Sequence, residues 1–440
     1  MRRRRLAKLR RRATIGDNSG RPSLQPIVIA PRFLPLYFSF AAAYVLSYTY
    51  RTANAVISPE LSAGLNIGAS SLGLLTSAYF VAFAAMQIPA GMLLDRYGPR
   101  RIEPILLTIA GCGALAFAAS EDLAGLAIAR ALIGAGVSVC LMAPLKAIAT
   151  WYSGERQASL AGWIMVAGGI GALLSTAPLA AALTLLSWRG IFVALSVATF
   201  ASALCIVWVV PDTPAHSRAA GWKDQWAGVK KVFGSARFWW VAPLGAVATG
   251  SFMAILGLWS VPWLMDVDGY SRTVAADHLL VVGIVILGGY LGLGFFATAL
   301  RRYGIGARHL LAAGFGLHIV MLALIVMQAL PSTYVAWALF GLGSAVNVLG
   351  FTVIGEGFPP EAAARANTAL NLLLFTSSFA AQWGIGVVVD AARAVLAIDI
   401  ASALRLAFAL VLAADALAFA WFALGWRRHA LVAPQLRVAA

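Results

Sequence analysis

The chain alternates long apolar stretches with short polar segments. About 20 helical residues, at a rise of about 1.5 Å each, cross a hydrocarbon core about 30 Å thick, so the apolar stretches predict membrane-spanning helices. Their apolar residues do not alternate strictly with polar ones, which favours helices over the strands of a membrane barrel. The expected fold class is an all-α polytopic membrane protein. About twelve spans are predicted, at residues 33–52, 71–90, 102–119, 123–146, 157–181, 188–210, 238–262, 278–299, 307–329, 332–355, 366–390 and 403–425.

After the N-terminal segment, the longest polar interruption lies at residues 211–237 and divides the spans into about six and six. Trp222, Trp226 and Phe233 recur within it at near-helical spacing, which predicts an amphipathic helix on the membrane surface. Most other loops are too short to hold a soluble catalytic lobe. The expected organisation is a basic tail, a six-helix bundle, a central loop, a second six-helix bundle and a short tail, at residues 1–32, 33–210, 211–237, 238–426 and 427–440.

Composition agrees with a membrane protein and excludes a nucleic-acid-binding one. The chain is 61% hydrophobic and 11% charged, whereas a soluble domain carries about 25% charged residues. The net charge of +16 is explained by position: with the N-terminus in the cytosol, about 26 of the Lys and Arg residues fall on the cytosolic side. We therefore expect a multi-pass protein of the plasma (cell inner) membrane with both termini cytosolic. The Arg-rich residues 2–12 lack a following apolar region, so they indicate a tail held near anionic lipid, not a cleaved signal.

Several kinds of chemistry have no candidate residues. Cys112, Cys140 and Cys205 all fall inside predicted spans, where they are interpreted as small packing residues. Neither a metal-ligand spacing nor a phosphate-binding Gly-x-x-x-x-Gly-Lys-Ser/Thr loop is present. We therefore expect no metal, no cofactor and no ATP-driven pump, and we expect that the protein is not an enzyme.

A charged loop joins the second and third predicted spans. Gly91, Asp95, Arg96, Gly98 and Arg101 stand in it, and a degraded copy follows about 200 residues later at 301–308. An ionised Asp at a membrane boundary needs a partner. For Asp95 we expect that partner to be a neighbouring arginine or the positive N-terminus of a helix; the arginines concerned are Arg96, Arg100 and Arg101. Such a contact, formed in one conformation only, would make these residues a gating motif.

These loop residues match the Gly-x-x-x-Asp-Arg-x-Gly-x-Arg/Lys signature of the major facilitator superfamily, which the chain resembles over nearly everything after residue 33. Arg130, Gly134 and Gly136 are similar to the family's second signature. The resemblance implies two pseudo-symmetric six-helix bundles that rock around a central cavity lined by the first, fourth, seventh and tenth helices. The second half departs from the signature, because Arg301 stands where Asp95 does in the first. We therefore expect an asymmetric gate.

Positive charges inside the spans favour an anionic substrate. Arg51, at the far end of the first predicted span, and Arg130 are the candidate cavity residues, and Lys146 lies near the inner end of the fourth span. The guanidinium fork recognises carboxylate or phosphate, and few carboxylates oppose these groups. The Tyr-x-x-Arg ending of the first span also resembles that of the organophosphate/phosphate antiporters, and this resemblance implies a second Arg on the seventh helix. The seventh span here carries no charge, which favours a carboxylate over a phosphate ester. The alternative is that Arg51 reaches the outer interface and Lys146 the inner one.

Uncharged polar and aromatic residues in the spans would complete the site. Each alone is as consistent with an interhelical hydrogen bond, worth about 0.6–2 kcal/mol. The candidates are Tyr44, Tyr48, Gln87, Asn347, Asn371, Gln382 and the aromatic Trp259.

For energy coupling, Asp415 and His318 are the titratable groups deepest in their spans. The alternative for each is a structural role, in which it forms a hydrogen bond or ion pair with another helix.

The leading hypothesis is a monomeric secondary transporter in the lipid bilayer, moving a small organic, anionic solute by alternating access. A coupling proton or a counter-solute is expected as its partner. The alternatives are a proton-coupled efflux pump for drugs or amphipathic compounds, a non-transporting sensor on the same fold, and a membrane-embedded enzyme.

Overall fold

The computed structural model describes residues 33–65, 67–152, 154–212, 222–330 and 332–430. Its elements in the first half are α2 (Phe33–Leu65), α3 (Ala69–Tyr97), α4 (Pro99–Ala119), α5 (Leu123–Gly136), α6 (Met142–Trp151), α7 (Gly154–Leu174), α8 (Ala177–Ala182) and α9 (Trp188–Val209). After α10 (Trp222–Phe233), the second half holds α11 (Ala236–Ala254), the π-helix η1 (Ile255–Trp259), α12 (Ser260–Asp266), α13 (Arg272–Arg301), α14 (Ala307–Val326), α15 (Thr333–Ser344), α16 (Asn347–Gly355), α17 (Pro360–Leu396) and α18 (Ile400–Ala430).

Four of the membrane rods are interrupted helices. α5 is continued by α6, α7 by α8, α11 by η1 and α12, and α15 by α16, so the described residues form six rods before α10 and six after it. Nine helices in this part of the chain are long and apolar enough to cross a membrane by length and composition. The rods outside those nine are α2, α5–α6 and α7–α8.

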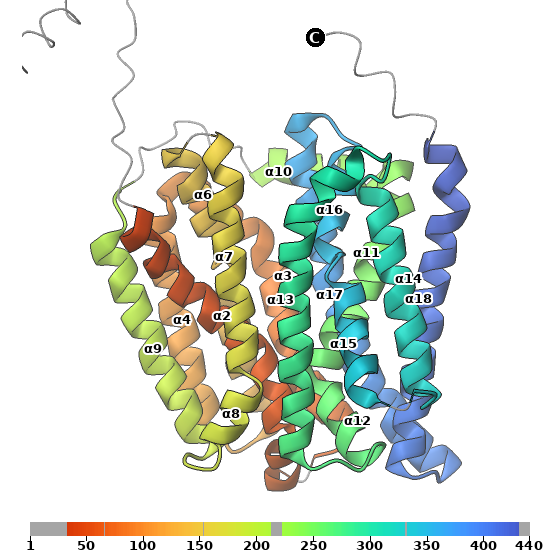
Figure 1. The fold of residues 1–440 in the computed structure, drawn as a ribbon. Coiled ribbons are helices and arrows are strands. Elements are labelled where there is room, and N and C mark those ends of the chain that lie inside the picture. The colour runs from red at the N-terminus through yellow and green to blue at the C-terminus, as the bar shows by residue number, and fades with distance from the viewer. Residues whose placement is uncertain (1–32, 66, 153, 213–221, 331, 431–440) are drawn as a thin grey trace, which may run out of the picture.

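The two halves lie beside each other (Figure 1). α10 lies across one end of the molecule, beside α6 and α16, and this end is called the α10 end. The opposite end, with α8 and α12, is called the α12 end. The halves touch mainly through α3 against α17, with further contacts of α2 on η1 and α12 and of α13 on α7 and α8. The predicted helix in the central loop is confirmed as α10.

The first span is longer than predicted. The sequence interpretation ended it at residue 52, just after Arg51, but α2 continues to Leu65. Arg51 therefore lies in the middle of the helix, and its expected position at the far end was wrong. A charged residue lowers local hydropathy, so the apolar run ends near Arg51 although the helix does not. Residue 52 is not the end of the helix, because aromatic rings and not water surround the Arg51 guanidinium.

Glycines allow the closest helix contacts in the first bundle. A Cβ on Gly171 of α7 would lie 2.2 Å from the Val45 carbonyl oxygen of α2. At the same place Thr49 Oγ1 donates a hydrogen bond to the Gly171 carbonyl, at 3.1 Å. Backbone cannot yield as the end of a flexible side chain can, so only glycine fits here.

Gly171→Ala is expected to destabilise the protein by about 1–3 kcal/mol, because α2 and α7 must separate to admit the methyl group. The measurement is the melting temperature of the detergent-purified protein. Gly162→Ala is the matched control, since the same helix offers open space there, and alanine gains up to about 1 kcal/mol of helix propensity. Equal melting temperatures for the two variants would contradict the packing.

Candidate functional site

Arg51 is a buried cation in the middle of the molecule, with 8% of its surface exposed. Its guanidinium carbon lies 4.5 Å from the ring centroid of Tyr48, 5.2 Å from that of Phe83 and 5.5 Å from that of Phe375. Its Nε has no hydrogen-bond partner. Among the described residues no carboxylate lies within ion-pair distance of this charge. Cation–π contacts offset part of the burial cost, but a buried charge without a counter-ion remains unfavourable.

Phenol groups from both halves surround the guanidinium. Tyr44, Tyr48 and Tyr79 of the first half lie within electrostatic range of it. Tyr290 of α13 also interacts electrostatically with Arg51, and it lies close to the Asn347 side chain of α16. The site therefore combines one positive charge with hydroxyl and amide groups that both donate and accept hydrogen bonds.

Contacts between α3 and α17 close one side of this site. Phe83 and Phe375 have ring centroids 4.2 Å apart. One turn further along, the Asn371 amide donates to Gln87 Oε1 at 2.7 Å. Since α3 belongs to the first half and α17 to the second, both contacts join the halves directly beside the buried cation.

A glycine makes room for the tyrosines, and an irregular helix lies beside Arg51. A Cβ on Gly168 of α7 would lie 2.6 Å from the Tyr44 ring and 2.9 Å from the Tyr48 ring. Gly257 of η1 faces the Arg51 carbonyl oxygen, which would lie 3.9 Å from an added Cβ, an ordinary contact distance. Single π-turns inside longer helices frequently occur at functional sites.

Three predicted site residues lie outside this group: Arg130, Trp259 and Gln382. Arg130 is fully buried in the first bundle, donates to the Tyr50 carbonyl at 2.8 Å, and lies 5.3 Å from the Tyr79 ring centroid. It therefore sits behind Tyr79, which separates it from Arg51. Trp259 donates its indole N–H to the Gln382 carbonyl at 2.9 Å, at the α3–α17 contact. Four residues at the site were missed: Tyr79, Phe83, Tyr290 and Phe375. Tyr79 and Phe83 stand four residues apart, as Phe83 and Gln87 do, and that helical spacing was the available signal.

The expected partner of Asp95 was wrong. Asp95 pairs with Lys146 of α6, and Lys146 therefore does not simply extend to an interface. Arg100 and Arg101 instead lie 3.0 Å and 3.9 Å from the carboxylate of Asp212. The reason is direction: Asp95 is in the last turn of α3, facing α6, whereas the arginines begin α4, which packs on α9.

The remaining motif residues shape the turn between α3 and α4. Gly98 has a φ of 78°, a conformation that suits glycine, and it joins the two helices. Arg96 lies over the Tyr97 ring at 5.2 Å, and Gly91 has open space where a side chain would project. Since Asp95 and Lys146 both belong to the first half, their ion pair does not join the halves.

Charged contacts that do join the halves lie at the α12 end. Glu60 of α2 pairs with Arg272 of α13. The Asp390 carboxylate of α17 accepts hydrogen bonds from the backbone N–H groups of Ala69, at 3.1 Å, and Ser70, at 2.7 Å, in the first turn of α3. In the described part of the chain, each ion pair at the α10 end stays within one half. Glu60 was not predicted at this contact, because the first span was expected to end at residue 52 and α2 continues to Leu65.

A profile described as Major Facilitator Superfamily matches residues 40–382 of the chain. The hexuronate transporter of Escherichia coli (strain K12) is 30% identical over 168 residues, which cover 38% of this chain and 37% of that protein. The galacturonate transporter of Dickeya chrysanthemi is 27% identical over 161 residues, covering 37% of this chain and 47% of that protein. The chain thus spans less than half the length of these curated relatives. A solved structure of the nucleoside transporter NupG superimposes with a TM-score of 0.70 at 14% identity, covering 88% of this chain and 99% of that one. This likeness shows the fold.

Proposed function

The chain belongs to the major facilitator superfamily, and from that premise we propose that it is a secondary transporter of small organic anions of the sugar-acid class. The observation that carries the proposal is the Arg51 guanidinium, buried between the halves without a carboxylate partner. A substrate carboxylate would supply the missing counter-ion through charge-assisted hydrogen bonds. The named relatives carry hexuronate and galacturonate, which are anions of this kind.

The neutral groups around Arg51 suit a hydroxylated molecule. The phenols of Tyr44, Tyr48 and Tyr290 and the amide of Asn347 both donate and accept hydrogen bonds, as sugar hydroxyls do. A single guanidinium suits a singly charged carboxylate better than a phosphate ester. The alternative of an efflux pump for cationic drugs is disfavoured. No carboxylate among the described residues pairs with Arg51, so the site presents a net positive charge that would repel a cation.

We further infer that the protein lies in the cell inner membrane with its α10 end facing the cytosol. The loops at that end carry most of the Lys and Arg residues outside the spans. On this orientation the Glu60–Arg272 and Asp390–α3 contacts close the exterior side. Substrate would then leave or enter through the cytosolic end, and rocking of the halves would exchange the two states. The unit proposed is a monomer, since each half contributes to one site.

Binding in detergent tests the substrate class directly. We expect galacturonate and glucuronate to raise the melting temperature, while galactose and glucose, which differ by the carboxylate alone, have no effect. Stabilisation by cationic drugs and not by sugar acids would overturn the proposal. Uptake of labelled galacturonate into proteoliposomes then separates a transporter from a sensor, which would bind without flux.

A further inference from the structure

His318 and Asp415 form a buried pair inside the second bundle. His318 Nε2 of α14 lies 3.1 Å from Asp415 Oδ2 of α18, and both side chains have 0% exposure. Ser251 Oγ of α11 lies 2.8 and 3.0 Å from the two carboxylate oxygens. Ser344 Oγ of α15 lies 2.7 Å from His318 Nδ1. One group from each of four helices therefore meets here.

The hydrogen bonds around the pair define two protonation states. Ser344 Oγ also lies 3.0 Å from the Phe340 carbonyl, so it can donate there while accepting from His318 Nδ1–H. In that arrangement His318 and Asp415 share one further proton and the pair is neutral overall. If the pair loses one proton, the neutral imidazole carries its single remaining hydrogen on Nε2, toward the Asp415 carboxylate, so Nδ1 has lost its own hydrogen and must accept from Ser344. Ser344 then gives up its bond to Phe340, and one net negative charge is buried.

The surroundings make that negative charge costly. Phe340 stacks on His318 with centroids 4.5 Å apart, and Phe252 and Phe315 lie at 6.4 and 6.3 Å. α16 carries no charge within its bounds. Other charged or titratable groups on the helices packed here belong to turns away from the pair. They are Arg237 on α11, Asp266 on α12, Arg272, Asp277, His278 and Tyr290 on α13, Arg308 and His309 on α14, Tyr334 on α15, Arg405 on α18, and Arg365, Asp390 and Arg393 on α17.

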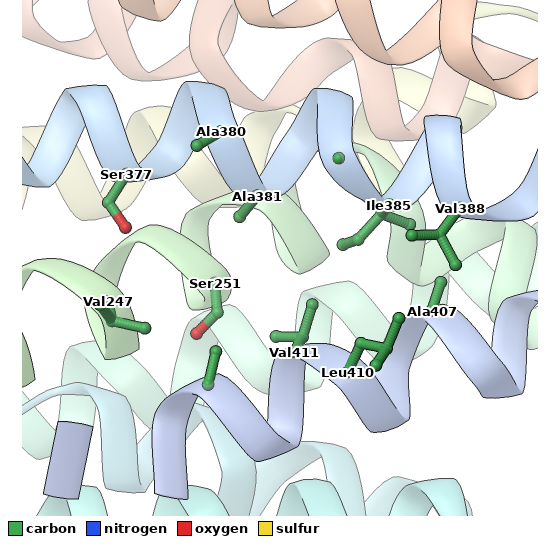
Figure 2. Close-up of a pocket in the computed structure, with 12 residues that line it drawn as sticks. Val247, Ser251, Ser377, Ala380, Ala381, Ile385, Val388, Ala407, Leu410 and Val411 are labelled. Carbon is green, nitrogen blue, oxygen red and sulfur yellow. The ribbon is translucent and has the colours of Figure 1, made fainter. Parts of the chain in front are cut away.

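A crevice brings open volume close to the pair. About 290 Å³ lies between α11, α17 and α18, and Ser251 and Ala414, the neighbour of Asp415, line it. Figure 2 shows Ser251 and Ser377 toward one end and the apolar Ile385, Val388 and Leu410 toward the other. Two hydroxyls supply the polar partners that a single water molecule needs. The crevice therefore offers a route for a proton to Ser251 and the carboxylate behind it.

The two serines connect the pair to the Arg51 site. Ser251 lies four residues before η1, whose Gly257 approaches the Arg51 backbone. Ser344 is the last residue of α15, and α16 begins at Asn347, which lies close to Tyr290 beside Arg51. The interrupted helices α11–η1–α12 and α15–α16 therefore each carry one serine whose hydroxyl bonds the buried pair, close to the point of interruption. If the Ser344 hydroxyl donates its hydrogen bond to His318 and no longer to the Phe340 carbonyl, the change occurs at the α15–α16 junction itself.

We propose that His318 and Asp415 form the proton-binding site that couples transport to a proton gradient, with Ser251 and Ser344 relaying its occupancy to the Arg51 site. This inference rests on the proposed transport of sugar acids. While the pair is protonated and neutral, Ser344 at the end of α15 keeps its hydrogen bond to the Phe340 carbonyl. Loss of the proton shifts that hydroxyl to His318 and loosens the junction beside Asn347. A charged group at membrane depth that served packing alone would be an expensive choice.

The test uses proteoliposomes and labelled galacturonate in two modes, accumulation driven by a pH gradient and exchange at equal pH. Asp415→Asn and His318→Gln are expected to abolish gradient-driven accumulation and to retain exchange. Asp399→Asn, at an exposed carboxylate before α18, and His278→Gln, at a buried histidine bonded to Thr333, are the matched controls and should keep both modes. Accumulation at the wild-type level in both test variants would overturn the proposal.

Failure of the proposal and failure of the proposed function give different results. Exchange in the wild type without any response to the pH gradient would sink the proton site and leave the transporter intact. Absence of flux in both modes would sink the transport proposal. The site then has a readout without substrate: the curve of melting temperature against pH should differ between the wild type and Asp415→Asn, which removes one partner of the pair. Superimposable curves would overturn the site.

Discussion

Replacing Arg51 by methionine is expected to abolish sugar-acid binding and to raise the melting temperature of the ligand-free protein. Binding fails because the substrate carboxylate loses its counter-ion. Stability rises because a buried, unpaired charge is replaced by an apolar chain of similar length among the rings of Tyr48, Phe83 and Phe375. Titration of galacturonate, followed by the melting temperature or by calorimetry, measures both effects on one sample.

Arg51→Lys separates charge from shape. Lysine keeps the positive charge but cannot present the planar fork that bonds both carboxylate oxygens. A hydrogen bond to a charged group is worth about 1.5–3 kcal/mol, so the loss of one is expected to weaken binding about tenfold or more. Unchanged affinity in the lysine variant would show that the guanidinium fork does not hold the ligand.

Arg130→Met is the comparison that tests the assignment between the two buried arginines. Arg130 donates to the Tyr50 carbonyl and lies behind Tyr79. Its loss is expected to lower stability while sugar acids still bind. If Arg130→Met abolished binding and Arg51→Met did not, the substrate carboxylate would have to be placed inside the first bundle.

The membrane spans were predictable because lipid leaves the backbone few choices. Uninterrupted apolar runs must form helices, and the interrupted rods α5–α6 and α15–α16 still carry that pattern. The end of α2 was not predictable in this way. Hydropathy records only the transfer of a residue from water, whereas Arg51 is covered by rings from other helices, and Glu60 beyond it reaches a partner on α13.

The site was partly predictable for a different reason. Tyr44, Tyr48 and Arg51 share one face of one helix, so their spacing in the sequence already places them together. Pairs from distant helices depend on how the helices pack. Asp95 meets Lys146 across 51 residues, and Gln87 meets Asn371 across 284. No local pattern specifies such pairs, and each arginine adjacent to Asp95 was an equally reasonable partner before the helices were placed.

Asp390→Asn is expected to shift the protein toward a state that is open at the α12 end. The Asp390 carboxylate accepts two backbone hydrogen bonds at the positive N-terminus of α3. Gly68, before α3, offers no side-chain cap, and its missing Cβ leaves the space that the carboxylate occupies. The cap comes from the other half of the molecule, so it exists only while the halves touch at this end. Asparagine keeps the size but loses the charge.

Distances between spin labels measure this shift. Cysteines placed at Leu185 and Val395, exposed by 85% and 80% in the first and second halves, report the separation of the halves at the α12 end. The background would lack the natural Cys112, Cys140 and Cys205. The loss of about 1.5–3 kcal/mol for a hydrogen bond to a charged group predicts that the open population rises about tenfold or more relative to the closed one.

Asp399→Asn is the matched control, because the Asp399 carboxylate accepts its hydrogen bond from Ser402 N, within the second half. Its distance distribution should equal that of the wild type. Glu60→Gln should add to the effect of Asp390→Asn, since the Glu60–Arg272 pair is a second contact between the halves at the same end. An unchanged distribution in the Asp390→Asn, Glu60→Gln double variant would mean that apolar packing of α3 against α17 holds this end closed by itself. Charge would then have no part in setting which side of the membrane the Arg51 site faces.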